Sequence, residues 1–336
     1  MWKFREMSTP ERADLLPLLA NLTSERFEAV ALEVFRYQAD KNRLMAEWLR
    51  LLGRRPDAIG HYSEIPFLPI QFFKTRTIKT GDWPEETVFT SSSTTGQTPS
   101  MHFVRRLDYY LENTRRGFSA QYGPPEDWCV LALLPAYLER SGSSLVVMAD
   151  DMIRRSKHPE SGFFLHDLDR LALVLQQCRA KKTPTLLLGV SFALLDLAER
   201  YPADLSGITV METGGMKGRR KELTRHELHE TLRRAFRLDT IHSEYGMTEL
   251  FSQAYSRGGR FRPAGTMRVV ATEANDPFAL APEGRTGVLN IVDLANLDTC
   301  SFIATEDLGK VYADGSFEVL GRLDVAEIRG CNLMVE

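Results

Sequence analysis

The sequence predicts an α/β fold, with a layered core around a largely parallel sheet and a small antiparallel β subdomain after it. Apolar, strand-like runs alternate with helix-like stretches through the middle of the chain, which is the pattern of helices packed on a parallel sheet. After Gly265 the pattern changes to short strand-like runs separated by Gly, Asp, Asn and Pro, as in antiparallel sheets. With 336 residues and 43% hydrophobic content, the chain can bury a large core.

The expected elements begin with one long amphipathic helix over 24–53, where apolar residues such as Phe27 and Val30 recur at helical spacing. Pro66 and Pro69 then favour an extended segment. We expect core strands at 87–90, 128–135, 185–190, 207–213 and 239–243, with helices at 105–121, 143–156, 166–181, 191–201 and 219–236. The later strands are expected at 267–272, 286–295, 301–305, 309–313 and 316–321. The predicted parts are an N-terminal helical segment at 1–84, the α/β core at 85–264, the β subdomain at 265–320 and a C-terminal tail at 321–336.

The charge balance and hydropathy exclude several classes of protein. Lys and Arg total 42 and Asp and Glu total 45, so the net charge of −3 gives no electrostatic reason to expect nucleic acid as the main partner. No apolar run approaches the roughly 18 residues that span a bilayer. The N-terminal residues also lack the uninterrupted apolar stretch of a signal peptide. These features predict a cytoplasmic protein without a transmembrane segment.

The cysteines and histidines do not form a metal or disulfide motif. Cys129, Cys178 and Cys300 lie far apart along the chain and are expected to be reduced, packed thiols. Two histidines, His226 and His229, lie in a stretch that resembles a zinc-protease helix, but they are spaced i, i+3 where that helix needs i, i+4. We therefore expect them on the polar face of a helix.

The stretch TSSSTTGQTPS is unusually rich in hydroxyl side chains and lies between a predicted strand and a predicted helix. Such a loop is either a flexible linker or an anion cradle, because hydroxyls and loop N–H groups can all donate to a phosphate. It is not a Walker P-loop, since no lysine follows its glycine. The candidate phosphate-binding residues are Thr90, Ser91, Ser92, Ser93, Thr94, Thr95 and Gly96.

This loop resembles the phosphate loop of the adenylate-forming superfamily, which contains acyl- and aryl-CoA ligases, luciferases and peptide-synthetase adenylation domains. It departs from that pattern at Ser93, where the family has glycine, and at Ser100, where lysine is usual. The segment METGGMKG resembles the family's glycine-rich adenine-binding segment. That resemblance adds Gly214, Gly215 and Met216 to the candidate nucleotide site.

Three later segments strengthen the resemblance. HSEYGMTE resembles the YGxTE motif, which implies that Tyr245 stacks on adenine, that Thr248 bonds the α-phosphate and that Glu249 helps to hold Mg²⁺. Gly246 belongs to the same motif, although a purely structural Tyr-Gly turn is an alternative reading. TEDLG and GRLD resemble the TGDLG and GRxD motifs, which implies that Asp307 binds the ribose hydroxyls and that Arg322 lies near ribose or phosphate.

From about residue 65 to residue 334 the chain is similar to the acyl-protein synthetase (LuxE-type) family within this superfamily. That resemblance implies ATP and Mg²⁺ as cofactors, a fatty acid as substrate and formation of acyl-AMP. The acyl group would pass to Cys331 and then to a reductase or carrier protein. Because the sequence ends soon after Asp324, we expect a hinge-like tail in place of the family's C-terminal lid domain and its catalytic lysine.

Several alternatives stay open at this point. The protein could be a CoA ligase that releases acyl-CoA, or a non-catalytic nucleotide-binding partner of a reductase or synthase. The segment GVSFA around Ser191 resembles part of a serine-hydrolase elbow, but it lacks the second glycine. Cys331 could be an incidental cysteine, and Cys300 is a weaker candidate for the acyl acceptor.

Overall fold

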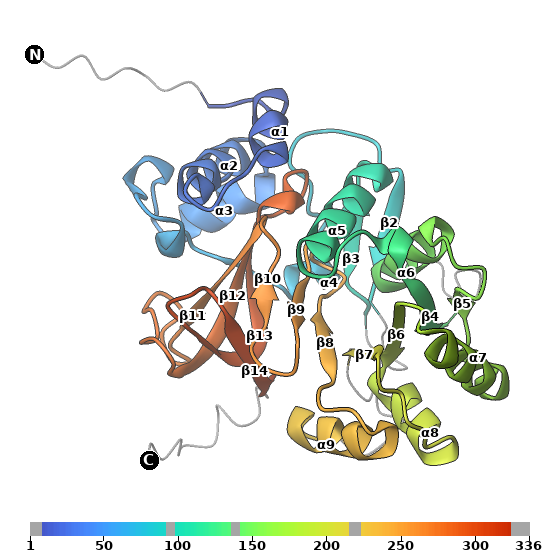
Figure 1. Ribbon diagram of the computed structural model, residues 1–336. Coiled ribbons are helices and arrows are strands. Elements are labelled where there is room, and N and C mark those ends of the chain that lie inside the picture. The colour runs from blue at the N-terminus through green and yellow to red at the C-terminus, as the bar shows by residue number, and fades with distance from the viewer. Residues whose placement is uncertain (1–8, 92–97, 136–141, 215–222, 324–336) are drawn as a thin grey trace, which may run out of the picture.

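The structure is a computed structural model in which a mostly parallel sheet and an antiparallel sheet lie side by side, with helices packed around both (Figure 1). It describes residues 9–91, 98–135, 142–214 and 223–323. No helix within these ranges is long and apolar enough to cross a membrane.

The larger sheet has the strand order β10-β9-β8-β7-β6-β4-β5, and its strands β8, β7, β6, β4 and β5 run parallel. Its strands are β4 (Cys129–Leu133), β5 (Gly162–Phe163), β6 (Thr185–Val190), β7 (Ile208–Thr213), β8 (His242–Tyr245), β9 (Ala254–Ser256) and β10 (Arg262–Pro263). The helices around it are α5 (Leu107–Tyr122), α6 (Ser144–Arg155), α7 (Leu168–Lys181), α8 (Ser191–Arg200) and α9 (Arg225–Phe236). Central strands β4 and β6 are buried throughout, as expected for a sheet covered on both faces. The predicted alternation of strands and helices is confirmed.

The antiparallel sheet has the order β1-β13-β12-β11, and β14 pairs with β13. Its strands are β1 (Leu68–Pro69), β11 (Met267–Thr272), β12 (Thr286–Asp293), β13 (Phe302–Val311) and β14 (Phe317–Arg322). Short β1 runs parallel to β13, so this sheet is not purely antiparallel. The prediction of two strands at 301–305 and 309–313 is wrong, because both belong to the single strand β13.

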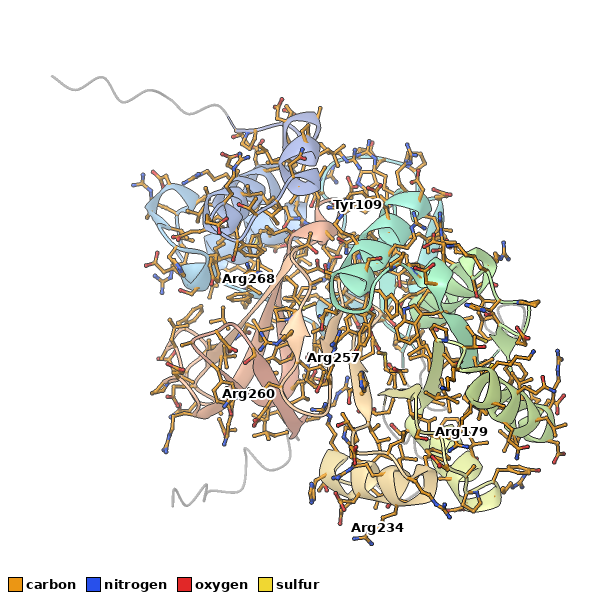
Figure 2. The ribbon with its side chains drawn as sticks, in the orientation of Figure 1. Tyr109, Arg179, Arg234, Arg257, Arg260 and Arg268 are labelled. Atoms are coloured by element: carbon orange, nitrogen blue, oxygen red, sulfur yellow. The ribbon has the colours of Figure 1, made fainter. Side chains whose placement is uncertain are left out.

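The N-terminal helices share one hydrophobic core with the antiparallel sheet. These helices are α1 (Arg12–Ala20), α2 (Phe27–Lys41), α3 (Arg43–Leu51) and the short α4 (Phe72–Thr75), accompanied by 3-10 turns at Pro56–Ala58 and Tyr62–Glu64. The rings of Phe35 and Phe302 meet edge to face at 5.7 Å between centroids. Arg268 on β11, which is labelled in Figure 2, has its Cζ 4.3 Å from the centroid of the Phe27 ring. The helices therefore cover one face of this sheet.

The predicted single helix over 24–53 is wrong, because Asn42 divides it into α2 and α3. The Asn42 side chain accepts hydrogen bonds from the backbone N–H groups of Leu44 and Met45, both at 3.1 Å, and so caps the start of α3. Its amide nitrogen donates to the carbonyl of Thr299 at 2.8 Å. A helical pattern on both sides of a buried cap looks continuous in the sequence, but the cap changes the direction of the chain.

The hydroxyl-rich loop lies in a β-hairpin, which the sequence did not predict. Strand β2 (Thr87–Thr90) pairs antiparallel with β3 (Met101–Val104), and together they form a separate two-stranded sheet. The predicted strand at 87–90 is confirmed, but the loop leads into β3 before helix α5 begins.

The buried carboxylate of Asp293 joins the two large sheets. It ends β12 and accepts hydrogen bonds from the backbone N–H groups of Phe251 and Ser252, at 2.8 and 2.9 Å, in the segment between β8 and β9. The Ser252 hydroxyl and the Ala295 N–H also donate to it, at 2.6 and 3.1 Å. Burial raises the pKa of this carboxyl, and the four hydrogen bonds oppose that rise.

We predict that Asp293→Asn destabilises the protein by about 3 kcal/mol, because an amide NH₂ would face groups that are themselves donors. Chemical denaturation monitored by fluorescence measures this free energy of unfolding. The matched control is Asp239→Asn at an exposed position, which should change the free energy by less than about 0.5 kcal/mol. Equal stabilities of the two variants would contradict the role given to Asp293.

Candidate active site

A cavity of about 1010 Å³ opens where the carboxyl ends of the parallel strands meet the antiparallel sheet. Residues at the ends of β6, β7 and β8 line it, as do residues of β13 and β14. This edge of an α/β sheet is the usual place for a ligand. The volume is at the upper end of the range for small-molecule sites, which leaves room for a nucleotide and a second substrate.

The two ends of the hydroxyl-rich loop lie at this cavity and are bonded to each other. The Ser91 N–H donates to the Ser100 carbonyl at 3.1 Å, and the Ser100 N–H donates to the Ser91 hydroxyl oxygen at 2.8 Å. Thr90, Ser91 and Ser100 all line the cavity. The predicted loop residues Ser92, Ser93, Thr94, Thr95 and Gly96 lie outside the described residues.

Tyr245, Asp307 and Arg322 lie together on one wall. The Tyr245 hydroxyl donates to Asp307 Oδ2 at 2.8 Å, and Arg322 Nε lies 3.4 Å from Asp307 Oδ1. Burial raises the pKa of the Asp307 carboxyl, against the effects of Tyr245 and Arg322. The ring of Tyr245 packs edge-on against Phe317 at 5.4 Å. A carboxylate has about four acceptor positions, so Asp307 can still accept from a ligand.

The backbone holds Thr248 and Glu249 in place at the cavity. The carbonyl of Thr248 accepts from Nδ1 of His102 at 2.8 Å, and the carbonyl of Glu249 accepts from the amide of Asn296 at 2.8 Å. Burial raises the pKa of the Glu249 carboxyl, while a hydrogen bond from the Ser100 side chain opposes that rise. Ser100 thus bonds the predicted metal ligand.

Lys74 is a cavity residue that the sequence analysis missed. It comes from α4, outside every sequence motif, and it lines the cavity with Glu249 and Arg322. Its positive charge favours the ionised form of Glu249. A lone lysine in a short helix has no distinctive sequence signal, so only the fold could reveal this cation.

Gly214 and Gly246 lie at the ends of β7 and β8. Gly214 has φ +62°, a conformation that favours glycine, and its carbonyl accepts from the Ser191 hydroxyl at 2.6 Å. A side chain at Gly246 would collide with the Glu244 carboxylate, which accounts for glycine at this position. Gly215 and Met216 lie outside the described residues.

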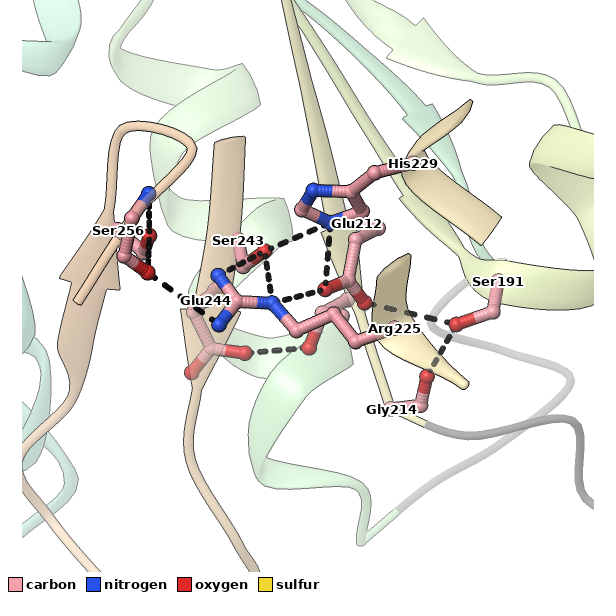
Figure 3. Close-up of polar contacts among 10 residues, drawn as sticks. Ser191, Glu212, Gly214, Arg225, His229, Ser243, Glu244 and Ser256 are labelled. Carbon is pink, nitrogen blue, oxygen red and sulfur yellow. Dashed lines mark hydrogen bonds and ion pairs between the residues drawn. The ribbon is translucent and has the colours of Figure 1, made fainter. Parts of the chain in front are cut away.

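A polar cluster beside the cavity is the second feature that the sequence analysis missed (Figure 3). Arg225 donates to the Ser243 hydroxyl at 2.9 Å, and Glu212 Oε1 lies 3.4 Å from His229 Nε2 and 3.6 Å from Arg225 Nε. His226 is exposed on α9, as predicted, but the prediction fails for His229, whose ring turns inward to Glu212. A glutamate inside an apolar strand, such as Glu212 in ITVMET, is a signal that could have indicated this cluster.

Glu244 is buried on the neighbouring strand β8. The Thr213 hydroxyl donates to its Oε2 (Figure 3). Burial raises the pKa of the Glu244 carboxyl from 4.5 to about 7; the Thr213 bond opposes the shift and the nearby charge of Glu212 adds to it.

Three of the four cysteines are buried, as predicted. Burial raises the pKa of the Cys300 thiol to about 12, and the same cause raises that of Cys129 to about 12. Both are therefore poor nucleophiles near neutral pH. Cys331, the predicted acyl acceptor, lies outside the described residues.

Solved structures with this fold include ligases. ATP-bound MatB from Rhodopseudomonas palustris has a TM-score of 0.51 and 17% identity over 70% of this chain and 47% of that chain. An open conformation of 2-hydroxyisobutyryl-CoA ligase, in complex with 2-HIB-AMP and CoA, has a TM-score of 0.66 and 13% identity over 96% and 76% of the two chains. These similarities confirm the predicted fold, that of the large domain of adenylate-forming enzymes.

The match to MatB spans about half the length of that protein. No protein-family model matches the sequence, and no curated protein matches it.

We predict that Glu244 makes the protein less stable as pH rises from about 4.5 to about 7. In that window the folded state binds more protons than the unfolded state, so the free energy of unfolding falls, and it levels off above the folded-state pKa. Glu244→Gln should remove this part of the pH dependence. Thermal unfolding of both proteins across the window measures it, and Glu112→Gln on the exposed face of α5 is the control. Identical pH profiles for the wild type and Glu244→Gln would contradict the shift.

Proposed function

We propose that the protein activates a carboxylic acid with ATP to form an acyl-AMP. One observation carries this proposal: Tyr245, Thr248, Glu249, Asp307 and Arg322, from separate motifs, line a single cavity. The fold shared with ATP-bound and acyl-AMP-bound proteins supports it.

The reaction joins a substrate carboxylate oxygen to the α-phosphorus of ATP, and the bond to pyrophosphate breaks. A carboxylate is a poor electrophile until this mixed anhydride forms, because its leaving group is otherwise an oxide. The Thr248 hydroxyl donates a hydrogen bond to the α-phosphate, and the Asp307 carboxylate accepts hydrogen bonds from the ribose hydroxyls. Lys74 and Arg322 offset the negative charge that gathers on the departing pyrophosphate.

Glu249 fits the role of a magnesium ligand. Its carboxyl is buried, faces the cavity and has neighbouring cations, which is an environment for a charged phosphate group and its metal. Within the described ranges no three metal-ligating side chains gather. Mg²⁺ in phosphate sites is usually held by one or two carboxylates together with phosphate oxygens, and Glu249 would supply one such carboxylate. When bound, the ion would neutralise phosphate charge.

We further propose that the acyl group passes to a cysteine thiol, for which Cys331 is the candidate. The thiolate attacks the acyl carbon, a thioester forms and AMP leaves with the electron pair of the broken bond. A fatty acid as substrate, a reductase or carrier as final acceptor and a cytoplasmic location come from the family resemblance. A CoA ligase is the second candidate. The match to 2-hydroxyisobutyryl-CoA ligase, which covers 76% of that protein, is to a structure in complex with CoA.

The contacts of Ser191 argue against a serine hydrolase. Its hydroxyl donates to the Gly214 carbonyl and lies 3.5 Å from Glu212 Oε2. A serine nucleophile needs a base such as histidine to take its proton. In the described part of the chain, the Ser191 hydroxyl instead bonds the backbone just after β7.

We predict that Glu249→Gln lowers acid-dependent pyrophosphate exchange roughly hundredfold, because it removes charge at the phosphates without changing side-chain volume. Thermal stability should stay within a few degrees of the wild type, since a buried carboxyl with a raised pKa is replaced by a neutral group. Exchange with ATP, Mg²⁺ and a panel of acids measures the effect, with Glu112→Gln as the control. Normal exchange in Glu249→Gln would reject its assignment.

We predict that incubation with ATP, Mg²⁺ and a labelled acid leaves a label on the protein that neutral hydroxylamine releases. Cys331→Ser should lose this label and keep acyl-AMP formation. Cys300→Ser, which changes a buried thiol, should keep both. Label that persists in Cys331→Ser would exclude this residue as the acceptor, and release of soluble acyl-CoA on adding CoA would favour the ligase.

A further inference from the structure

The wall of the cavity that carries Glu244 differs from the wall that carries Tyr245. Neighbouring residues in a strand point to opposite faces, so the Glu244 side chain lies on the other face of β8 from Tyr245 and its partner Asp307. Tyr110 of α5 and Ser144 and Met148 of α6 also line the cavity. Since Tyr245, Asp307 and Arg322 lie together on the other face, this second wall is available to the acid.

Two acceptor groups gather at this wall. A Cβ built on Gly246 would collide with Glu244 Oε1 and would lie 3.5 Å from Cγ of Gln253. The side chains of Glu244 and Gln253 therefore border the same glycine, and both line the cavity. The hydroxyl of Thr213 already occupies the other carboxylate oxygen, Oε2.

Gln253 is buried, and within the described ranges only one end of its side-chain amide has a hydrogen-bond partner. Its side-chain nitrogen donates to the Phe251 carbonyl at 3.4 Å, and because that partner can only accept, the amide oxygen must point away from it. This oxygen is buried without a hydrogen-bond partner among the described residues, and Gln253 is only 5% exposed. Buried polar atoms are rarely left unpaired, and Gln253 lines the cavity, so its oxygen is the candidate acceptor for a ligand donor.

We propose that the acid activated here carries an amino or hydroxyl group that donates to the Gln253 side-chain oxygen and to the Glu244 carboxylate. The proposal rests on the acyl-adenylating function above and specifies its substrate class. An acceptor pair of this kind matches N–H or O–H donors and offers nothing to a methylene chain.

This substrate class departs from the unsubstituted fatty acid that the family resemblance implies. A plain alkyl chain against this wall would leave the buried Gln253 oxygen, together with Glu244 Oε1 in the ionised form of that carboxyl, without a donor. Sites built to bond a hydroxyl or amine strongly reject the analogue that lacks it, for this reason. The apolar side of the same wall, with Met148 and the ring of Tyr110, suits the carbon chain that carries the donor.

The test is pyrophosphate exchange with ATP and Mg²⁺ across matched sets of acids. Each set holds an unsubstituted acid and its amino- and hydroxyl-substituted counterparts, with the substituent placed at successive carbons along short, medium and long chains. We expect at least one substituted acid to exceed its unsubstituted counterpart in kcat/KM by roughly tenfold or more. The amino and hydroxyl arms identify which donor is preferred.

Two variants link that preference to this wall. Gln253→Leu should lower the preference for the substituted acid over its unsubstituted counterpart roughly tenfold. Glu244→Gln keeps an oxygen for Thr213 and turns an amide donor toward the ligand, so it should favour a keto-substituted acid over the hydroxyl form. Gln121→Leu on α5, outside the cavity lining, is the matched control, and thermal unfolding checks that each variant folds.

The outcomes separate this inference from the function on which it rests. Exchange that is equal or better with unsubstituted acids in every set would overturn the inference and leave acid activation standing. A preference that both variants retain would also overturn it, because the donor would then bind elsewhere. If no acid in any set supports exchange, the adenylating function fails, and the substrate class fails with it.

Discussion

The buried carboxylate of Asp293 sets how the two large sheets meet, and the cavity depends on that junction. It takes hydrogen bonds from the backbone of Phe251 and Ser252, which follow the YGMTE segment, while Asp293 itself ends a strand of the antiparallel sheet. The side-chain amide of Asn113 on α5 also holds this segment, because it donates to the Phe251 carbonyl at 2.9 Å. Because Thr248 lies a few residues before these contacts, they fix the position of the cavity wall that carries Thr248 and Glu249.

Strand alternation then decides what each wall of the cavity presents. Strands β7 and β8 are paired so that Glu212 lies beside Ser243 and Thr213 beside Glu244. One face of this pair therefore carries the Glu212 cluster with Arg225, and the other carries the buried Glu244. A shift of one residue in the pairing would exchange these two faces. The register of two short strands thus separates two polar environments that are adjacent in the sequence.

Much of the fold was predictable because apolar runs and turn residues report local structure directly, as at Leu187 in β6 and Gly265 before β11. The motif residues Tyr245 and Asp307 were also found, because their types and order resemble a known pattern. The hydrogen bond between their side chains could not be predicted, because it depends on how the two sheets meet. Lys74 and Gln253 carry no local signal, and their importance comes only from the space they border.

The buried imidazole of His102 has a consequence for proton chemistry at the cavity. Its Nδ1 donates to the Thr248 carbonyl and its Nε2 accepts from the Thr299 hydroxyl at 2.9 Å, so a single neutral tautomer satisfies both partners. Burial lowers the pKa of His102 to about 4, whereas that of Glu244 lies near 7. The two groups therefore titrate in separate ranges. Across the pH range in which Glu244 gains or loses a proton, the histidine that supports the Thr248 backbone therefore keeps a constant charge.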